Sequence, residues 1–281
     1  MKHFLIYTNH HKDPEMEITG RISTYLEGKG CRCSSLTKEN GSVLEETAIP
    51  KDVYCMIVIG GDGTMLQAAW DTKRLDIPLI GVNRGTLGYM TEIEPGDLEE
   101  ALDKLVAGDF TTEKRMMLHG SIKWNSGDVQ EDWALNDIVI SRKGSLQIHK
   151  LKVYVNGQFL NEYNADGVIV STPTGSTGYS LSAGGPIVEP KARLIMLTPI
   201  CPHTLNARSI ILSPEDEIVI EVPADRNGEA QAVEASFDGA HMVSMKTGEK
   251  IKIVASEKTT EIIQINKVSF LEVLHKKMSD H

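Results

Sequence analysis

Hydrophobic positions in the first third of the chain alternate between strand-like and helix-like patterns. The strand-like runs lie at 3–8, 53–59 and 77–82, and the helix-like segments lie at 14–30, 64–73 and 97–107. The last of these helices opens on the letters DLEE, which indicate a capping box. Strands that alternate with helices form parallel sheets covered by helices. We therefore predict an α/β domain with a Rossmann-like parallel sheet over residues 1–114.

From about Met116 the pattern changes to short runs in which apolar and polar residues alternate. Turn residues separate these runs, including the pair Asn156 and Gly157, which is typical of tight β-hairpins. Residues 115–261 are therefore predicted to form a second, mostly antiparallel β domain. The final segment, SFLEVLHKKM, has a helical pattern, and we expect residues 262–281 to pack back on the first domain.

Composition and charge narrow the class of protein. The 281 residues are 41% hydrophobic and 24% charged, as in ordinary globular enzymes. A formal net charge of −10 argues against a nucleic-acid partner, because phosphate backbones need a basic surface. No apolar run approaches the roughly 20 residues that cross a bilayer, so no membrane partner is expected. The four cysteines show no metal-ligand spacing and no secretory leader is visible, which indicates a cytoplasmic protein without a metal held by its own side chains.

Five residues, GGDGT at 60–64, join the second strand-like run to a helix. They lack the lysine of a Walker A loop and the spacing of the GxGxxG dinucleotide fingerprint. Backbone amides at a helix N-terminus point toward a bound anion, so this turn is predicted to bind phosphate. We expect its glycines to permit left-handed backbone angles and the close approach of a ligand. The candidate phosphate-binding residues of the turn are Gly60, Gly61, Gly63 and Thr64.

A second loop, residues 81–85, follows the next strand. Ligands of parallel sheets gather at the carboxyl ends of the strands, so both loops are expected to face one crevice. Arg84 is the basic candidate for a phosphate contact in this loop. A surface salt bridge is an equal alternative for a lone arginine.

Asp62 is the one carboxylate in the glycine-rich turn, and it would repel a bare phosphate. One explanation is structural, because an aspartate at this position can cap the following helix. The other explanation is chemical. Asp62 could meet a hydroxyl that attacks a phosphorus atom, or share a divalent cation with the phosphates.

Four segments outside this turn carry a resemblance to a known family. They are IPLIGVNRGTLGYM, ALNDIVISR, YNADGVIVSTPTGSTGYSLSAGGPIV and TPICPHTLNARSIIL. GGDGT alone is similar to a kinase superfamily that includes lipid kinases and, as GGDGS, phosphofructokinases. The four segments together resemble NAD kinases from about residue 55 to residue 215. Lipid kinases would show a GTxND-type segment where this chain has GVNRGTLGYM.

The resemblance implies an enzyme that transfers a phosphoryl group from ATP to the 2′-hydroxyl of the adenosine ribose of NAD. Asp62 would accept the proton of that hydroxyl, and Mg²⁺ would arrive with ATP as the divalent cation. The residues that would bind NAD by this resemblance are Asp62, Gly63, Asn136, Asp137, Asn164, Asp166, Thr177, Gly178, Tyr179, Ser180, Leu181 and Ser182. The family more often has Glu where Asp137 stands and a basic residue where Asn164 stands.

Several alternatives stay open from the residues themselves. Asn136 and Asp137 could form a turn at a strand edge, and Tyr179 could be a core aromatic rather than a stacking surface. The run 172–182 is predicted to be a polar loop between two apolar segments. The alternative functions are a lipid or other small-alcohol kinase and a non-catalytic dinucleotide sensor. Polyphosphate could replace ATP, and a homodimer or homotetramer is expected because antiparallel sheets expose strand edges.

Overall fold

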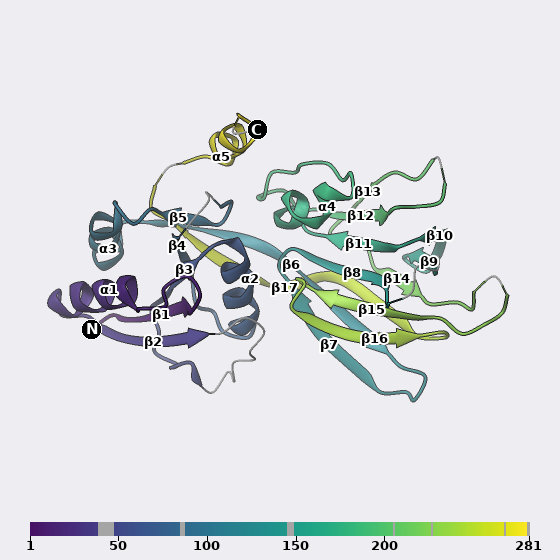
Figure 1. Ribbon diagram of the computed structural model, residues 1–281, viewed down its shortest axis with the longest axis horizontal. Helices are drawn as coiled ribbons and strands as arrows, with labels where there is room; N and C mark the ends of the chain where they lie inside the picture. The colour runs from purple at the N-terminus through teal and green to yellow at the C-terminus, as the bar shows by residue number, and fades with distance from the viewer. Residues whose placement is uncertain are drawn as a thin grey trace. The chain divides into compact units, whose positions relative to one another are not determined.

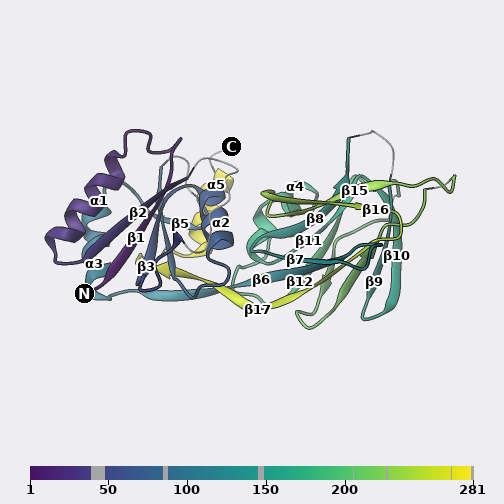
Figure 2. The same ribbon diagram turned by 90° about the horizontal axis from the view of Figure 1, so that it is seen from below.

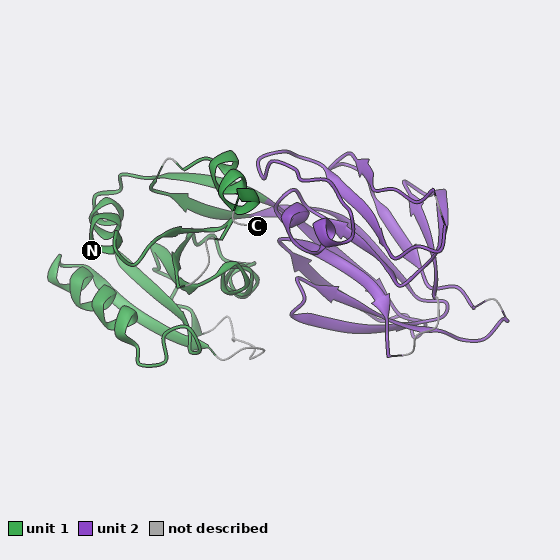
Figure 3. Ribbon diagram, turned by 45° about the horizontal axis from the view of Figure 1, so that its top comes forward, with its two compact units in different colours: residues 1–115, 260–281 green, residues 116–259 purple. Residues whose placement is uncertain are grey.

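The computed structural model describes residues 1–38, 48–84, 88–144, 149–204, 206–225, 227–266 and 268–279. The chain divides into two compact units, coloured separately in Figure 3. Unit 1 consists of residues 1–115 and 260–281, and unit 2 consists of residues 116–259. Unit 1 is an α/β structure and unit 2 is mostly antiparallel β structure, so the predicted fold class is confirmed.

Unit 1 is built on a parallel sheet. Its strands are β1 (His3–Asn9), β2 (Arg32–Lys38), β3 (Cys55–Gly60), β4 (Leu79–Asn83) and β5 (Thr91–Ile93), joined by the last residues of β17 (Lys250–Gln264). The strand order from the centre outward is β4, β3, β1, β2, and β17 adds to β4 through the pair Ile262 and Leu79. β3 is buried at every position, which explains its uninterrupted apolar sequence.

Helices cover both faces of this sheet. They are α1 (Glu17–Gly28), α2 (Asp62–Asp71) and α3 (Leu98–Ala107). Figure 2 shows α1 and α3 on one side of the strands and α2 on the other. Apolar residues from α1 and α3 form one core with the strand side chains that alternate toward them, such as Ile22, Leu102 and Ile57. α3 begins after Asp97, whose side chain makes no capping hydrogen bond, so the predicted capping box is wrong.

Two strands of unit 1 were not predicted, β2 and the three-residue β5. β2 is mostly polar, with the sequence RCSSLTK, and lacks the apolar alternation that marks a half-buried strand. It lies at the end of the strand order and pairs along its whole length with β1. Its last residue, Lys38, inserts a buried ammonium group 2.6 Å from Asp71 Oδ2 at the end of α2. Tyr7 donates to the same carboxylate at 2.6 Å, so this cluster ties α2 to the sheet.

The C-terminal segment returns to unit 1, as the sequence predicts. α5 (Phe270–Ser279) begins with Ser269 and Glu272 capping each other's backbone amides at 3.2 and 2.7 Å. Its Phe270 ring lies 5.9 Å from the ring of Tyr89, and Lys277 Nζ lies 4.7 Å from the same ring. Before the helix, the backbone amides of Ile265 and Asn266 donate to Glu92.

Unit 2 is built from antiparallel strands in two layers. Its strands are β6 (Thr111–Lys123), which begins in unit 1, β7 (Val129–Ala134), β8 (Asp137–Arg142), β9 (His149–Val155), β10 (Gln158–Ala165), β11 (Gly167–Ser171), β12 (Ile195–Ile200), β13 (Ile210–Leu212), β14 (Ile218–Glu221), β15 (Ala232–Phe237), β16 (His241–Lys246) and most of β17. One layer has the order β13, β12, β11, β8, β15, β16 (Figure 1). The other contains β10, β9, β14 and β17, with β6 paired to β17 and β7 paired to β6. Side chains from both layers, such as Ile140, Val168 and Ile220, share one core.

Turn chemistry follows the sequence closely in one hairpin of unit 2. Asn156 and Gly157 have φ angles of 51° and 76°, the left-handed values that a two-residue type I′ turn requires. The predicted loop at 172–182 is more ordered than expected. It contains a 3₁₀ turn, η2 (Thr174–Thr177), and a single helical turn, α4 (Tyr179–Ser182).

Candidate functional site

The GGDGT turn places the end of β3 directly before the first residue of α2, with Gly61 as the helix N-cap. A Cβ on Gly60 would lie 2.2 Å from Thr64 Oγ1, whereas a Cβ on Gly61 or Gly63 would meet no atom within 4 Å. None of these three glycines has a positive φ, so the prediction of left-handed angles is wrong. Gly60 is needed for packing against Thr64, and the other two leave the backbone of the turn uncovered.

Asp62 is half-buried and its carboxylate is held by a later segment of unit 1. Oδ2 accepts a hydrogen bond from the amide of Tyr89 at 2.8 Å, and Oδ1 accepts one from the amide of Met90 at 3.0 Å. A Cβ on Gly88 would lie 2.2 Å from Asp62 Oδ1, so only glycine fits there. Gly61 is the N-cap of α2, and the Asp62 carboxylate binds the amides of Tyr89 and Met90 instead of the helix, so the helix-cap alternative is wrong.

A buried arginine lies in the electrostatic field of Asp62. Arg115 is 5% exposed, and its Nε lies 2.7 Å from Glu113 Oε1. Burial lowers the pKa of this guanidinium, while the negative charges of Glu113 and Asp62 raise it. Its Nη1 has no hydrogen-bond partner among the residues that the structure describes. Sequence reasoning missed Arg115, because a single arginine in the run TTEKRMM carries no motif.

Arg84 is exposed, and its Nε donates to the backbone carbonyl of Lys12 at 3.0 Å. Residues 85–87 of its loop lie outside the described residues. Thr64, by contrast, is buried and receives a hydrogen bond from Asn9 Nδ2 at 3.4 Å. The two side chains predicted to contact phosphate therefore differ in their surroundings: Arg84 is at the surface and Thr64 is packed against Gly60.

In unit 2, Asn136 and Asp137 lie at the start of β8, directly beside the end of β11. Thr172 binds this segment from one side, with its amide donating to the Asn136 carbonyl at 2.8 Å and its hydroxyl donating to the Leu135 carbonyl at 2.6 Å. A Cβ on Gly175 would lie 2.2 Å from the Asn136 carbonyl oxygen. The backbone of η2 therefore approaches the pair as closely as glycine permits.

Three polar side-chain atoms near this pair are buried without a hydrogen-bond partner in the described part of the chain. They are Asn136 Oδ1, Ser171 Oγ and Thr174 Oγ1. Ser171 is the strand partner of Asp137, and Thr174 opens the turn that packs on Asn136. A buried polar atom without a partner costs about 1–3 kcal/mol, and a ligand rich in hydroxyl and amide groups would remove that cost. Sequence reasoning missed Ser171 and Thr174.

Asp137 has an unusual protonation equilibrium. Burial, and then the negative charge of Asp238, raise the pKa of its carboxyl from 3.8 to about 7. Asp238 is half-buried. Desolvation raises the pKa of its carboxyl to about 6, while the three backbone amide hydrogen bonds that it accepts act in the opposite direction and favour its ionised form. We therefore assign the negative charge of this pair to Asp238 and the proton, near neutral pH, to Asp137.

The predicted stretch 177–182 presents some side chains outward and others inward. Tyr179 is 47% exposed, so the core-aromatic alternative is wrong. Ser180 is buried with its hydroxyl 3.3 Å from Thr198 Oγ1, while Leu181 and Ser182 are exposed. Thr177 and Gly178 are half-buried, and Gly178 would place a Cβ 3.4 Å from Asn136 Nδ2.

Electrostatics connects Tyr179 to the other predicted residues of unit 2. Burial raises the pKa of its hydroxyl, and the charges of Cys201, Asp166 and Asp137 raise it further. Asp166 lies in the turn between β10 and β11, with Oδ1 at 3.6 Å from Arg142 Nε. Asn164 lies on β10, and its carbonyl accepts a hydrogen bond from the His203 amide at 2.8 Å. The fold therefore gathers Asp137, Asp166 and Tyr179, which are separated along the sequence.

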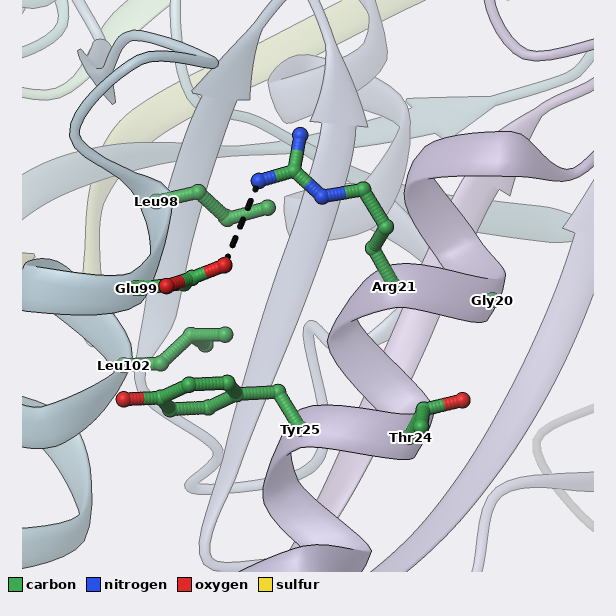
Figure 4. Close-up of a pocket in the computed structure, with 7 residues that line it drawn as sticks. All are labelled: Gly20, Arg21, Thr24, Tyr25, Leu98, Glu99 and Leu102. Carbon is green, nitrogen blue, oxygen red and sulfur yellow. Dashed lines mark ion pairs between the residues drawn. The ribbon is translucent and has the colours of Figure 1, made fainter.

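Two surface grooves contain none of the predicted residues. One, of about 330 Å³, lies between α1 and α3, where Tyr25 and Leu102 line it and Arg21 pairs with Glu99 at 3.6 Å (Figure 4). The other, of about 470 Å³, lies in unit 2 between Trp124, Lys143 and Lys246.

Two kinds of feature are absent from the described residues. No three His, Cys, Asp or Glu side chains there are placed to hold a metal ion together. No helix of the described ranges is long and apolar enough to span a membrane.

Comparison with known proteins gives two family matches and many relatives. A family model described as the ATP-NAD kinase N-terminal domain matches residues 14–110, and one described as the ATP-NAD kinase C-terminal domain matches residues 135–265. The chain is 45% identical to an NAD kinase of Lachnospira eligens over 99% of this chain and 100% of that protein. It is 46% identical to an NAD kinase of Agathobacter rectalis over the full length of both.

Solved structures share the fold. A yeast NADH kinase complexed with NADH has a TM-score of 0.87 at 22% identity, covering 99% of this chain and 88% of the yeast chain. An NAD kinase from Archaeoglobus fulgidus in complex with ATP has a TM-score of 0.79 at 24% identity and covers both chains completely.

Proposed function

The chain belongs to the NAD kinase family, and from this premise we propose that it transfers a phosphoryl group from ATP to the 2′-hydroxyl of the adenosine ribose of NAD, which yields NADP. The observation that carries the proposal is the fixed carboxylate of Asp62 at the start of α2. Two backbone amides orient it, and the neighbouring glycines leave the turn open to a phosphate.

Asp62 accepts the proton of the attacking 2′-hydroxyl in this mechanism. The new bond forms between the 2′-oxygen and the γ-phosphorus, the bond from the γ-phosphorus to the β–γ bridging oxygen breaks, and ADP leaves with that electron pair. Phosphoryl transfer has a loose transition state, so orientation of the hydroxyl counts as much as the basicity of Asp62. The positive charge of Arg115 offsets the repulsion between Asp62 and the phosphates.

Unit 2 supplies the dinucleotide-binding side chains. The side-chain amide of Asn136 can donate and accept hydrogen bonds. Its buried Oδ1 can accept one from a ribose hydroxyl or a base amino group. Tyr179 offers an exposed ring face for stacking. Asn164, Asp166, Thr177, Gly178 and the exposed members of α4 complete the proposed set.

A divalent cation fits this chemistry as a companion of ATP. Mg²⁺ prefers phosphate oxygens and water to an all-protein cage, and the described side chains form no such cage. Asp62 is the carboxylate of the turn that could contribute an oxygen ligand. When bound, Mg²⁺ neutralises charge on the phosphates, and Gly60, Gly61, Gly63, Thr64 and Arg84 are the proposed phosphate contacts.

The direct test is incubation of the purified chain with NAD, Mg²⁺ and either ATP or polyphosphate, followed by detection of NADP with an NADP-specific dehydrogenase. NADP formed in proportion to ADP supports the proposal. Phosphorylation of a glyceride or long-chain diol without NADP would instead support a lipid kinase. Tight NAD binding without nucleotide consumption would indicate a sensor.

A further inference from the structure

Asp238 lies in the tight turn between β15 and β16, distant in sequence from every predicted site residue. It is half-buried, and its φ of 50° places a non-glycine residue in the left-handed region. A side chain rarely adopts that conformation unless surrounding contacts impose it. The strained backbone of Asp238 therefore needs an explanation in the contacts that its carboxylate makes.

Those contacts all go to one segment. Asp238 Oδ1 accepts from the amides of Asn136 and Asp137 at 2.7 and 3.0 Å, and Oδ2 accepts from the amide of Leu135 at 2.7 Å. The Asp238 amide donates in return to the Asp137 carbonyl at 3.0 Å. Charge-assisted hydrogen bonds of this kind are about twice as strong as neutral ones.

Together with Thr172, these contacts account for every backbone polar group of residues 135–137. Asp238 binds the three amides and the last carbonyl, and Thr172 binds the first two carbonyls. The segment is therefore held from two sides, by the β15–β16 turn and by the residue that follows β11. A backbone fixed at all six groups leaves the side chains of Asn136 and Asp137 little freedom of direction.

We propose that Asp238 is a positioning residue for NAD: its carboxylate fixes the backbone of residues 135–137 and thereby directs Asn136 and Asp137 toward the dinucleotide. The inference rests on the proposed function. Asp238 does not touch the ligand in this scheme, and it acts through the two residues that do. Its negative charge has a second effect, because it adds to the burial that keeps a proton on Asp137, which can then donate as well as accept a hydrogen bond.

The test compares Asp238→Asn with the wild type in steady-state kinetics. An asparagine turns an NH₂ group toward at least one backbone amide, so the segment 135–137 loses hydrogen bonds. The side chains of Asn136 and Asp137 are then no longer held in their direction. We expect the KM for NAD to rise about tenfold or more, because small misplacements of binding groups are costly, while the KM for ATP stays within about twofold. Asp225→Asn is the matched control, since Asp225 also accepts two backbone amides, at 2.8 and 2.7 Å, in a loop of the same unit.

A pH profile separates positioning from a merely structural role. Loss of the Asp238 charge lowers the pKa of Asp137, so the pH dependence of the KM for NAD should move to lower pH in Asp238→Asn. The other ionisable groups around the pair are Asp132, with His241 at 3.8 Å from it, and Tyr179, Asp166 and Cys201. These groups are the same in the wild type and in Asp238→Asn. A difference between the two pH profiles of the KM for NAD is therefore due to Asp238.

A second variant guards against loss of folding. Thr172→Val removes the hydroxyl that holds the Leu135 carbonyl but keeps all charges, so it should raise the KM for NAD without moving the pH profile. An unchanged KM for NAD in both variants, with normal NADP formation by the wild type, would overturn the inference alone. Absence of NADP formation by the wild type would overturn the proposed function, and calorimetric titration with NAD would still measure the role of Asp238.

Discussion

At the scale of single residues, the orientation of Asp62 depends on a segment that follows it by almost thirty positions in the sequence. The amides of Tyr89 and Met90 occupy one lone pair on each carboxylate oxygen. Each oxygen keeps a second lone pair for a substrate hydroxyl or a cation. The side chain is thus oriented without losing its capacity to accept a proton.

Replacement of Asp62 by Asn should remove the proton acceptor, and it also turns an NH₂ group toward the amide of Tyr89 or Met90, so one of the two orienting hydrogen bonds is lost. We expect kcat to fall about 10²–10⁴-fold, the range for loss of a general base, with the dissociation constant for NAD changed only a few-fold. Rapid-quench measurement of NADP formation and calorimetric NAD titration give the two quantities. Asp76→Asn, at an exposed position beyond α2, is the control. Near-normal turnover of Asp62→Asn would disprove the assigned role.

The glycines of the turn can be separated by paired alanine substitutions. Gly60→Ala forces a methyl group against Thr64, and overpacking of this kind costs about 1–3 kcal/mol, so the free energy of unfolding should fall. Gly61→Ala meets no protein atom, so stability should be kept. If phosphate passes close to the backbone there, the KM for ATP rises in Gly61→Ala. Denaturant unfolding and ATP titrations check both, and equal stability loss in the two variants would contradict the geometry.

Sequence patterns predicted those site residues that belong to contiguous motifs. Asp62, Asn136 and Asp137 stand in recognisable segments, so the family resemblance could assign them roles. Asp238 and Arg115 lie outside these segments, and only the fold brings them near those residues. No local pattern predicts a carboxylate that binds amides about a hundred positions away.

At the scale of elements, the sequence likewise predicts what depends on local patterns and misses what depends on distant contacts. β1, β3 and β4 are buried strands with apolar runs, and their periodicity predicts them directly. β2 is specified instead by its pairing with β1 and by the buried contact of Lys38 with Asp71, neither of which a local window contains. The short helical turn at Tyr179 is fixed by packing of Ser180 and Gly185, so propensity alone predicted a loop.

The helix α5 offers a prediction about the segment that holds Asp62. Its Phe270 and Lys277 contact the ring of Tyr89, whose amide binds Asp62. Ending the chain at Asn266 should therefore loosen that segment and lower kcat about tenfold, since catalytic geometry tolerates little displacement. Little stability should be lost, because α5 has no buried residue.

Two comparisons complete this experiment. Tyr89→Ala should reproduce the fall in kcat within the full-length chain. Met278→Gln, at an exposed position of α5, should leave kcat unchanged. A truncated chain with normal kcat would show that α5 has no influence on the turn.

At the scale of the whole molecule, the neighbouring carboxyl groups of buried Asp137 and half-buried Asp238 couple the free energy of unfolding to pH. The folded pKa of Asp137, about 7, exceeds its unfolded value of 3.8. Between those values the folded chain binds more protons than the unfolded chain, so this group makes stability fall as pH rises, with the full loss present above pH 7. Asp137→Asn removes this loss of folding stability at high pH, because asparagine does not titrate. We expect its Tm relative to wild type to be higher at pH 8 than at pH 5, by roughly 2–4 °C for each kcal/mol.

Calorimetry at the two pH values checks this expectation, with Asp225→Asn as the control. A difference in Tm that is the same at both pH values would contradict the assigned proton. The pH at which NAD binds best in the wild type would then have to be set by another group.

Unit 1 is assembled from the two ends of the chain, and this has a consequence for biosynthesis. Ile262 pairs with Leu79 and Ile263 belongs to the unit 1 core, yet both follow the whole of unit 2. A ribosome releases the intervening β-sandwich before it delivers the strand that completes unit 1. Nascent chains that stall near their end would therefore carry a finished sandwich beside an unfinished α/β core, which is open to proteases and chaperones until translation terminates.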